Sequence, residues 1–420
     1  IININLSFAS TEIVTIDYAI TGGTATGGGV DYIMVEPGTL TFNPGQITKT
    51  ITINLVDDGV DESSETIVIT LSNPTNAKLG AITQHTAMIR DPGVEPPRHL
   101  VGYAETGRFC GWPANGAMWI WGNEIAVAFE MGWWMDTDDG HHRDPDRENE
   151  DVVIRSLDGG ETWTMKKHPI LGGCEVLQPS PGGINYAHPD FAYKAQSERF
   201  YVSYDRGRTW LGCYASPSLG CGDLSARTDY IVNSSNECLF FSACDFDPDR
   251  AFAYRTTDGG STYEFLGWMG PDDGTRSVCP STVRISDTQL VSAMRRKYPG
   301  NWIDVYVSYN DGRTWQFLSK VANTDTGDNN GSPPALVRMT DGRLVCAYGY
   351  RAYPYGIRAK VSDNNGQSWS QEIRLRDDGL NWDLGYPVMA QRPDGKLVTA
   401  YYYCTSDRPH QFIGVTIWEP

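Results

Sequence analysis

The sequence predicts an all-β protein in two parts, a small β-sandwich followed by a six-bladed β-propeller. Three observations predict this fold class. The 420 residues include 44 glycines, 24 prolines and 13 tryptophans, and 20% of them are charged, which is typical of a chain with many tight turns and aromatic anchors. A motif recurs about every 50 residues in the second part. Short runs of alternating apolar and polar residues fill the first part.

Residues 1–91 are predicted to form the sandwich. Apolar and polar residues alternate there in runs such as Val14 to Tyr18, Lys49 to Leu55 and Thr66 to Leu71. A period of two is typical of strands that bury one face, and clusters of Gly, Asn, Asp and Pro between the runs predict tight turns. This pattern indicates an antiparallel sandwich of short strands.

Acidic residues gather in the loops of this first part. Carboxylate oxygens that converge from several loops are preferred ligands of Ca²⁺, although a solvated acidic rim gives the same sequence pattern. The segments GTLTFNPGQ (38–46) and VDDGVDESSETIVITLSNP (56–74) resemble the Calx-β domain, and the likeness extends over nearly all of residues 1–91. The resemblance implies a Ca²⁺ site and a further strand ahead of the sandwich. The implied ligands are Asp31, Asp57, Asp58, Glu62 and Asp91.

A Pro-rich connector, PGVEPPR at residues 92–98, separates the sandwich from residues 99–420. Five segments of this second part share Ser or Thr, then Asp or Asn, then Gly and a closing aromatic residue. They are SLDGGETW (156–163), SYDRGRTW (203–210), TTDGGSTY (256–263), SYNDGRTW (308–315) and SDNNGQSW (362–369). The closing aromatic residues are 47, 53, 52 and 54 residues apart, and such a period predicts a propeller.

Each position of the motif has a mechanical use in a turn between two strands. The Asp or Asn side chain accepts hydrogen bonds from its own turn, the glycine takes a positive φ, and the aromatic residue is expected between neighbouring sheets. A sixth unit, residues 385–420, has strand-like runs but lacks the motif. Because the chain ends there, a strand from His99 to Ala104 is expected to complete this last blade and to close the ring.

Charge and hydropathy exclude two classes of partner. A net charge of −18 repels the phosphates of nucleic acids, and no run of about 18 apolar residues is present to span a membrane. The chain opens inside a strand-like run, so the native N-terminus and any signal peptide are expected ahead of it, and we expect a secreted protein. Nine cysteines show no zinc-binding spacing. In an oxidising compartment the candidate pairs are Cys213 with Cys221 and Cys238 with Cys244.

The openings of the six blades predict a pocket on the propeller axis. When the openings are aligned, each blade brings one residue to the axis. These residues are Trp112, His188, Arg227, Cys279, Pro333 and Tyr386. A polar and aromatic set of this kind favours a ligand site, whereas ordinary packing at the start of the strands explains part of it.

The repeated motif is the Asp-box of sialidases and related propellers. The segments RTDYIVN (227–233), CPSTVRISD (279–287) and WDLGYP (382–387) also resemble the bacterial sialidase-like BNR repeat family. In that family arginines hold the substrate carboxylate, a tyrosine is the nucleophile and an aspartate is the acid and base. The resemblance implies Tyr386 as nucleophile and Asp146 as acid, with Asp144 as the alternative. The predicted substrate-binding set is Arg295, Arg296, Arg351, Arg358, Arg108, Arg227, His188 and Trp112.

The chain departs from the family pattern at two positions. The arginine expected in the first blade is replaced by Gly111-Trp112-Pro113, which leaves Arg108 three residues early. The glutamate that activates the tyrosine is replaced by Cys279. The alternative partners for the tyrosine are Asp272, Asp273 and His188.

The sequence therefore predicts a secreted, exo-acting glycoside hydrolase on an acidic glycan, with no cofactor for the catalysis. Tyr386 and Asp146 would carry the chemistry and the arginines would clamp the anion. One alternative is a polysaccharide lyase, in which His188 or Tyr386 removes a proton beside a uronate. Another is a glycan-binding propeller without activity, which the absence of the glutamate favours.

Overall fold

In the computed structural model the chain divides into two compact units, Ile1–Pro96 and Pro97–Glu419. The structure describes most of the chain. The described residues are 2–34, 37–56, 65–80, 82–89, 95–137, 140–168, 171, 173–221, 224–225, 227–244, 249–297, 299–327 and 330–420.

The first unit is the predicted sandwich. A four-stranded antiparallel sheet in the order β4-β2-β7-β8 and the pairs β1-β5 and β3-β6 enclose one core, in which Ile51, Ile67 and Ile69 are buried. Alternate residues of each strand face this core, as the period of two predicts. The strands are β1 (Ile2–Asn5), β2 (Val14–Gly23), β3 (Tyr32–Ile33), β4 (Gly38–Phe42), β5 (Thr48–Ile51), β6 (Asn54–Leu55), β7 (Glu65–Thr75) and β8 (Gln84–Ile89).

Of the five implied Ca²⁺ ligands, the structure describes Asp31. Its side chain is buried, and Oδ2 accepts a hydrogen bond from the backbone N–H of Thr26 at 2.5 Å. Asp57, Asp58, Glu62 and Asp91 lie outside the described residues. Within the described residues, no three metal-binding side chains come together. Calcium binding by this unit therefore stays a prediction.

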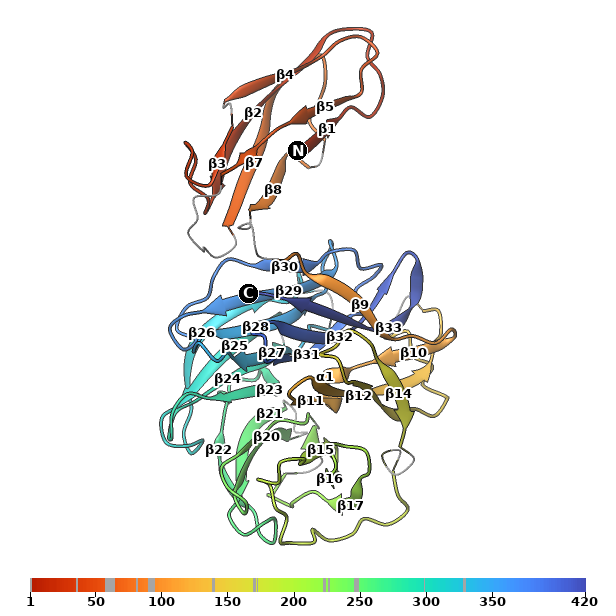
Figure 1. The fold of residues 1–420 in the computed structure, drawn as a ribbon, viewed down its shortest axis with the longest axis vertical. Coiled ribbons are helices and arrows are strands. Elements are labelled where there is room, and N and C mark those ends of the chain that lie inside the picture. The colour runs from red at the N-terminus through yellow and green to blue at the C-terminus, as the bar shows by residue number, and fades with distance from the viewer. Residues whose placement is uncertain are drawn as a thin grey trace. The chain divides into compact units, whose positions relative to one another are not determined.

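The second unit is a propeller of six antiparallel sheets that follow one another along the chain (Figure 1). Blade 1 holds β10 (Arg108–Gly111), α1 (Pro113–Gly116), β11 (Ala117–Trp121), β12 (Glu124–Trp133), β13 (Glu150–Ser156) and β14 (Thr164–Lys167). Blade 2 holds β15 (Ala192–Gln196), β16 (Arg199–Ser203) and β17 (Leu211–Ala215). Blade 3 holds β18 (Leu224–Ser225), β19 (Tyr230–Val232), β20 (Cys238–Cys244), β21 (Arg250–Thr256) and β22 (Glu264–Trp268).

Blades 4 and 5 each have four regular strands. Blade 4 holds β23 (Arg276–Arg284), β24 (Leu290–Lys297), β25 (Asn301–Ser308) and β26 (Gln316–Asn323). Blade 5 holds β27 (Pro334–Arg338), β28 (Leu344–Tyr350), β29 (Gly356–Ser362) and β30 (Ile373–Arg376). In both, the first strand in sequence is the innermost and the Asp-box joins the third strand to the fourth.

Blade 6 closes the ring with a strand from the other end of the propeller sequence. It holds β31 (Gly385–Gln391), β32 (Leu397–Thr405), β33 (Arg408–Trp418) and β9 (Arg98–Tyr103). β9 pairs antiparallel with β33, with Leu100 opposite Val415. The predicted closing strand is therefore confirmed, and it ties residues that are more than 300 positions apart in the sequence.

Blade 2 departs from the expected pattern. Its sheet has three strands among the described residues, and the predicted inner strand at residues 187–193 is largely a loop. The preceding segment PSPGGINYAHPD is rich in Pro and Gly, which break strands. Nearby, the backbone of Gln178 forms an isolated β-bridge with Tyr214 on β17, and Cys174 forms a disulfide with Cys213. β15 consequently takes the place nearest the axis in this blade.

The Asp-boxes work as their residue types predict. In all five, the Asp or Asn Oδ1 accepts a hydrogen bond at 2.8 to 2.9 Å from the backbone N–H four residues later. Each closing aromatic residue packs into a core between two neighbouring blades. These residues are Trp163, Trp210, Tyr263, Trp315 and Trp369. The sixth such core, between blades 5 and 6, is filled by Trp418 instead.

Replacing Asp158 of the first Asp-box with alanine is expected to lower the free energy of unfolding by about 1 to 2 kcal/mol, because Ser156 and Thr162 lose their acceptor. Hydrogen bonds from Thr162 lower the pKa of Asp158 to about 2. This stabilisation is therefore present above about pH 4 and is lost as the pH falls towards 2. Urea unfolding from pH 7 to pH 2 measures both effects.

Asp158→Asn is the matched control for this prediction, because Asn310 and Asn364 already make the same bonds in two other boxes. We expect Asp158→Asn to lose less stability than Asp158→Ala. Equal losses in the two variants would contradict the local role assigned to the side-chain oxygen.

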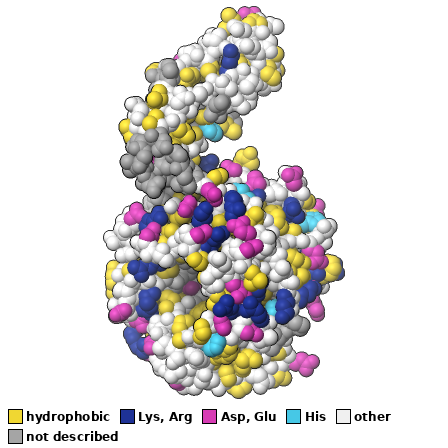
Figure 2. All heavy atoms as spheres, in the orientation of Figure 1, with side chains coloured by type: hydrophobic (Ala, Val, Ile, Leu, Met, Phe, Trp, Pro, Cys, Tyr) yellow, Lys and Arg dark blue, Asp and Glu magenta, His cyan; other side chains and the backbone are white. Residues whose placement is uncertain are grey.

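Two disulfides and many ion pairs hold the blades. The disulfides are Cys174–Cys213 and Cys221–Cys244, so the pairs predicted from the sequence are wrong. Cys238 is a buried free thiol on β20. Figure 2 shows basic side chains beside acidic ones over the visible face of the propeller. In the part of the chain that is described, no helix is long and apolar enough to cross a membrane.

Candidate functional site

The inner strands of blades 1, 4 and 6 are interrupted at the same point. Trp112, Cys279 and Tyr386 each precede a proline and adopt φ values of 55°, 54° and 48°. Residues with a Cβ rarely occupy this region, and the residue before a proline is usually extended. The strand pairing also shifts register beside Cys279 and beside Tyr386. Local strain of this kind is frequent at functional sites.

A pocket of about 500 Å³ lies beside two of these interruptions and is lined by Cys279 and Tyr386. It is also lined by Asn115 and Gly116, just before the inner strand β11. At the other end of β11, the carbonyl of Asn123 accepts a hydrogen bond from the backbone of Asp-box residue Gly159. The pocket therefore opens on the face opposite the Asp-boxes. We call it the entrance pocket.

Tyr386 and Arg295 meet in the entrance pocket. The Nη1 of Arg295 donates a hydrogen bond of 2.8 Å to the phenol oxygen of Tyr386. Arg295 reaches the pocket from the second strand of blade 4, where it pairs with Val278 beside the bulge at Cys279. Two of the predicted site residues, which are 91 positions apart in the sequence, are thus brought together.

Arg295 carries a buried charge that no acidic side chain neutralises. Its side chain is 8% exposed, and the structure gives it no ion pair within the described residues. Its Nε is buried without a hydrogen-bond partner. Burial works to lower the pKa of Arg295, but Tyr386 and Cys279 raise it by more, so the guanidinium stays charged. Buried charges are normally paired, which indicates that this one is matched by a ligand.

Arg296, the sequence alternative to Arg295, points to the other face of the same strand. It donates to both carboxylate oxygens of Asp273 at 2.8 and 3.0 Å, and Asp304 lies 3.6 Å away. Successive residues of a strand face opposite sides, so only one of the two arginines reaches the pocket. Asp273 is consequently committed to Arg296, and Asp272 is exposed. Neither aspartate is a partner for Tyr386.

A second charged group lines the opposite wall of the entrance pocket. Glu130 on β12 and Asp151 on β13 are directly paired in the sheet of blade 1. Lys194 on β15 reaches Asp151 at 3.1 Å, and Gln196 donates to the same carboxylate at 2.7 Å. Glu130 receives one bond of 3.3 Å from Asn149. The charge of Asp151 is therefore neutralised by Lys194, whereas Glu130 has no such partner among the described residues.

Glu130 has the electrostatics of a proton donor. Burial raises its pKa, and the negative charge of Asp151 adds to this, while Lys194, Arg143 and the bond from Asn149 oppose it. A carboxyl group in a pocket whose pKa is raised suits general acid catalysis. Glu130 was not among the residues predicted from the sequence. Its signal was a single acid inside the apolar run EIAVAFEMGWW, which an ordinary buried strand would not carry.

Arg351 supports the pocket from beneath. Its side chain is fully buried and donates to Tyr402 at 2.7 Å and to the carbonyls of Leu384 and Gly331 at 2.9 and 3.1 Å. Its guanidinium carbon lies 5.4 Å from the ring centre of Tyr386. Arg351 therefore fixes the segments on either side of Tyr386, and it does not line the entrance pocket.

The loop that follows β12 is fastened to blade 6 by Asp383. His141 and His142 approach its two oxygens at 2.5 and 3.2 Å, and Tyr402 donates to it at 2.7 Å. Burial works to raise the pKa of Asp383, but the two histidines lower it by more. Trp112, which was predicted on the axis, packs against His141 at 5.2 Å between ring centres. It belongs to this cluster rather than to the pocket wall.

The remaining predicted residues lie elsewhere. Arg358 faces Glu372 at 3.2 Å on the third strand of blade 5, so the expected convergence of Arg358 with Arg295 and Tyr386 is wrong. Arg108 pairs with Glu150 at 2.8 Å. His188 packs on Tyr204 in the loop of blade 2 and does not line the entrance pocket.

The predicted acid Asp146 is not brought to the pocket either. Asp146 is exposed, and its backbone N–H bonds to the side chain of Asp144, so the two form a turn in the loop. The backbone N–H of Asp144 bonds to Trp133 at 2.8 Å, which continues the hairpin of β12 and β13. Glu130, and not the predicted Asp146, lines the entrance pocket.

Comparisons with known proteins agree with this architecture. A family model described as the BNR repeat-like domain matches residues 115–399, and a Calx-beta domain model matches residues 2–93. A protein of unknown function from Dyadobacter fermentans has a TM-score of 0.61 at 20% identity, covering 78% of this chain and 99% of its own. The NanB sialidase from Streptococcus pneumoniae has a TM-score of 0.51 at 9% identity, covering 99% and 97%. Such low identities show a shared fold alone.

One curated relative matches over a short stretch. FRAS1-related extracellular matrix protein 2 from Homo sapiens is 46% identical over 55 residues, which are 13% of this chain. The match spans 2% of the length of that protein.

Proposed function

Because this chain belongs to the BNR repeat-like domain family, we propose that the entrance pocket is the active site of an exo-acting glycoside hydrolase for glycans that end in an acidic sugar. The observation that carries the proposal is the buried guanidinium of Arg295, which among the described residues has no acidic partner and has an unused Nε. A guanidinium binds a carboxylate with two parallel hydrogen bonds, so an acidic sugar would neutralise it.

Positive charge nearby supports an anionic substrate. Arg276 lines the same pocket and pairs with Asp249. Burial lowers the pKa of Lys297 to about 8, and the positive charges of Arg295 and Arg276 contribute to the shift. The positive charge is therefore local to the side of the pocket that holds Arg295 and Arg276, while acidic residues line other parts of the same pocket.

The chemistry would divide between two walls of the pocket. Tyr386 would attack the anomeric carbon as the bond to the leaving sugar breaks, with its phenol proton passing to solvent water, or it would stabilise the positive transition state. The hydrogen bond from Arg295 would stabilise negative charge developing on the phenol oxygen. Glu130 would give its proton to the oxygen of the leaving sugar. A phenol nucleophile suits an anionic sugar, since a carboxylate would repel it. Cys279 leaves the usual glutamate position without a base.

Turnover of acidic glycosides tests the proposal. We expect the full chain to release a free sugar from sialylated or uronate-terminated oligosaccharides, observed by NMR, and to leave neutral oligosaccharides intact. Tyr386→Phe should lower kcat by about 10²-fold or more. Tyr309→Phe, which removes a hydroxyl from an exposed ring, is the matched control and should change nothing.

The other outcomes identify the alternatives. An unsaturated product that absorbs in the near ultraviolet would show a lyase. Binding of acidic sugars without any turnover over long incubation would show a glycan-binding propeller. Equal rates for the wild type and Tyr386→Phe would remove the hydrolase assignment.

We also propose that the protein acts outside the cytoplasm. Cys174–Cys213 and Cys221–Cys244 support this, because disulfides persist mainly in oxidising compartments. Glycans that end in an acidic sugar, the proposed substrates, occur on cell surfaces and in secretions.

A further inference from the structure

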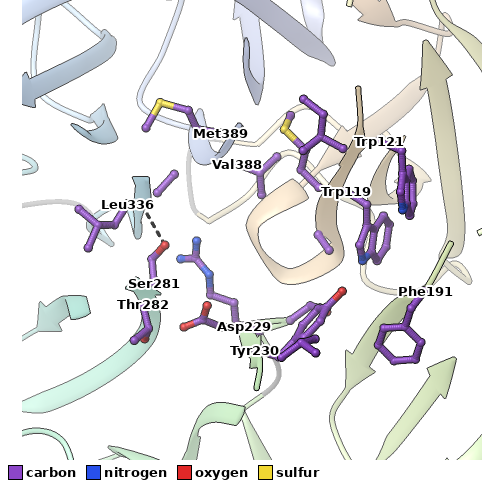
Figure 3. A pocket seen from close by; sticks show the side chains of 17 residues that line it. Trp119, Trp121, Phe191, Asp229, Tyr230, Ser281, Thr282, Leu336, Val388 and Met389 are labelled. Carbon is purple, nitrogen blue, oxygen red and sulfur yellow. Dashed lines mark hydrogen bonds between the residues drawn. The ribbon is translucent and has the colours of Figure 1, made fainter. Parts of the chain in front are cut away.

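A second cavity, of about 430 Å³, lies on the propeller axis (Figure 3). Where one inner strand lines both cavities, the residues that line the second cavity come later in that strand than those that line the entrance pocket. Ser281 follows Cys279 on β23, and Val388 follows Tyr386 on β31. Because these strands run towards the Asp-box face, the second cavity lies deeper along the axis in that direction. We call it the Asp-box pocket.

Arg227 stands between the two cavities. It lines the Asp-box pocket, and its Nη1 donates to the carbonyl of Pro334 at 2.7 Å and to that of Cys279 at 3.3 Å. Cys279 lines the entrance pocket, so these bonds bridge the axis between the two cavities. Arg227 was predicted to bind the same substrate as Tyr386. The structure places it on the other cavity.

Aromatic rings form one side of the Asp-box pocket. Figure 3 shows Trp119, Trp121, Phe191 and Tyr230 grouped together, with Trp119 and Trp121 next to each other. They come from the inner strands of blades 1 and 3 and from the start of blade 2. Such rings offer apolar faces of the size of a pyranose ring, with polar atoms at their edges.

Polar groups form the opposite side, and one of them lacks a partner. Figure 3 shows Asp229 with its carboxyl group on the side of Ser281 and Thr282. One oxygen of Asp229, Oδ2, is buried without a hydrogen-bond partner among the described residues. Burial raises the pKa of Asp229 to about 7, although Arg227 and Thr282 lower it. Buried polar atoms are nearly always satisfied, so an unused acceptor on the wall of a cavity indicates a ligand that donates a hydrogen bond.

We propose that the Asp-box pocket binds one neutral pyranose ring of a glycan, separately from the entrance pocket. A sugar has an apolar face for the aromatic side and hydroxyl groups that donate a hydrogen bond, as Asp229 requires. An apolar ligand would leave this oxygen unsatisfied. Arg227 interacts with Asp229 and donates to the carbonyls of Pro334 and Cys279, so its charge is already engaged and no acidic sugar is needed to balance it.

Titration of the 420-residue chain with methyl β-D-galactoside, methyl α-D-mannoside and methyl α-D-glucoside tests this proposal. We expect at least one of them to shift the NMR signal of the Trp119 indole N–H saturably, with a Kd on the order of 1 mM. Trp121→Ala should weaken that binding by about fivefold or more, because it removes part of the aromatic wall. Asp229→Asn should weaken it too, while keeping the size of the side chain.

Arg295→Met is the control that separates the two cavities. It lies in the entrance pocket and should leave the binding of the neutral glycosides unchanged. If the variants at Trp121 and Asp229 fail to fold, the titration of the wild-type chain still decides. No saturable shift with any of the three glycosides, or a shift that Arg295→Met abolishes, would overturn the proposal. This test is independent of any hydrolysis.

Discussion

Replacing Arg295 with methionine is expected to lower kcat/KM for an acidic glycoside by about 10³-fold. In the complex, Arg295 and the substrate carboxylate would form a buried charge pair. Removing one partner of such a pair costs about 3 to 5 kcal/mol. Methionine fills a similar volume, so the wall of the pocket should stay in place. Steady-state kinetics with one acidic glycoside measure the loss.

Two comparisons make this result specific. A neutral glycoside with the same leaving group should be a poor substrate for the wild type and should change little in Arg295→Met, since it has no carboxylate to lose. Arg296→Gln on the opposite face should lower the stability by leaving Asp273 without its partner, and should leave kcat/KM nearly unchanged. A loss of rate in Arg296→Gln at full stability would contradict the assignment of the two faces.

The propeller could be predicted because its signal is local. Each Asp-box is a closed set of hydrogen bonds within about five residues, such as those from Thr162 to Asp158, so the motif needs no distant partner to be recognised. The spacing of the motifs then fixes the number of blades. The closing strand β9 was predictable too, because a ring leaves its last sheet one strand short.

The site was less predictable because it depends on which face of a strand a residue occupies. Arg295 and Arg296 are adjacent in sequence, and the bulge at Cys279 decides which one reaches the axis. Arg358 was predicted to bind the substrate, but it lies on the third strand of its blade, where the side chain meets Glu372. Sequence distance along a blade does not report distance from the axis.

Contacts between blades were the least predictable. Glu130 and Lys194 line one pocket, although they lie on different blades. Lys194 is near the axis because blade 2 has β15 where the other blades have an inner strand. The disulfides follow the same principle, since Cys174 reaches Cys213 across a loop whose path no local pattern describes.

Replacing Glu130 with glutamine is the second variant from which we expect a large effect. With a sugar as leaving group, kcat should fall by about 10³-fold, since general acid catalysis commonly contributes 10²- to 10⁴-fold. With an aryl leaving group such as 4-nitrophenol, which departs without protonation, the loss should be about tenfold or less. Rates on matched sugar and aryl substrates measure this contrast, and equal losses on both would assign Glu130 a structural role.

The pH dependence of Glu130 has a sign that can be checked. Burial and the charge of Asp151 raise its pKa, so the wild type keeps the catalytic proton to higher pH and loses rate as the pH rises through that pKa. Glu130→Gln should lack this alkaline limb.

Asp151→Asn should move the alkaline limb to lower pH, for two reasons that act together. The variant removes the negative neighbour that raises the pKa of Glu130, and it frees the charge of Lys194, which now lies 3.1 Å from Asp151, to stabilise the Glu130 carboxylate. A shift to higher pH would contradict this assignment, because it would mean that the charges of Asp151 and Lys194 do not set the pKa of Glu130 in this way. The shift is read from kcat/KM against pH for the wild type and the variant, on the same sugar leaving group.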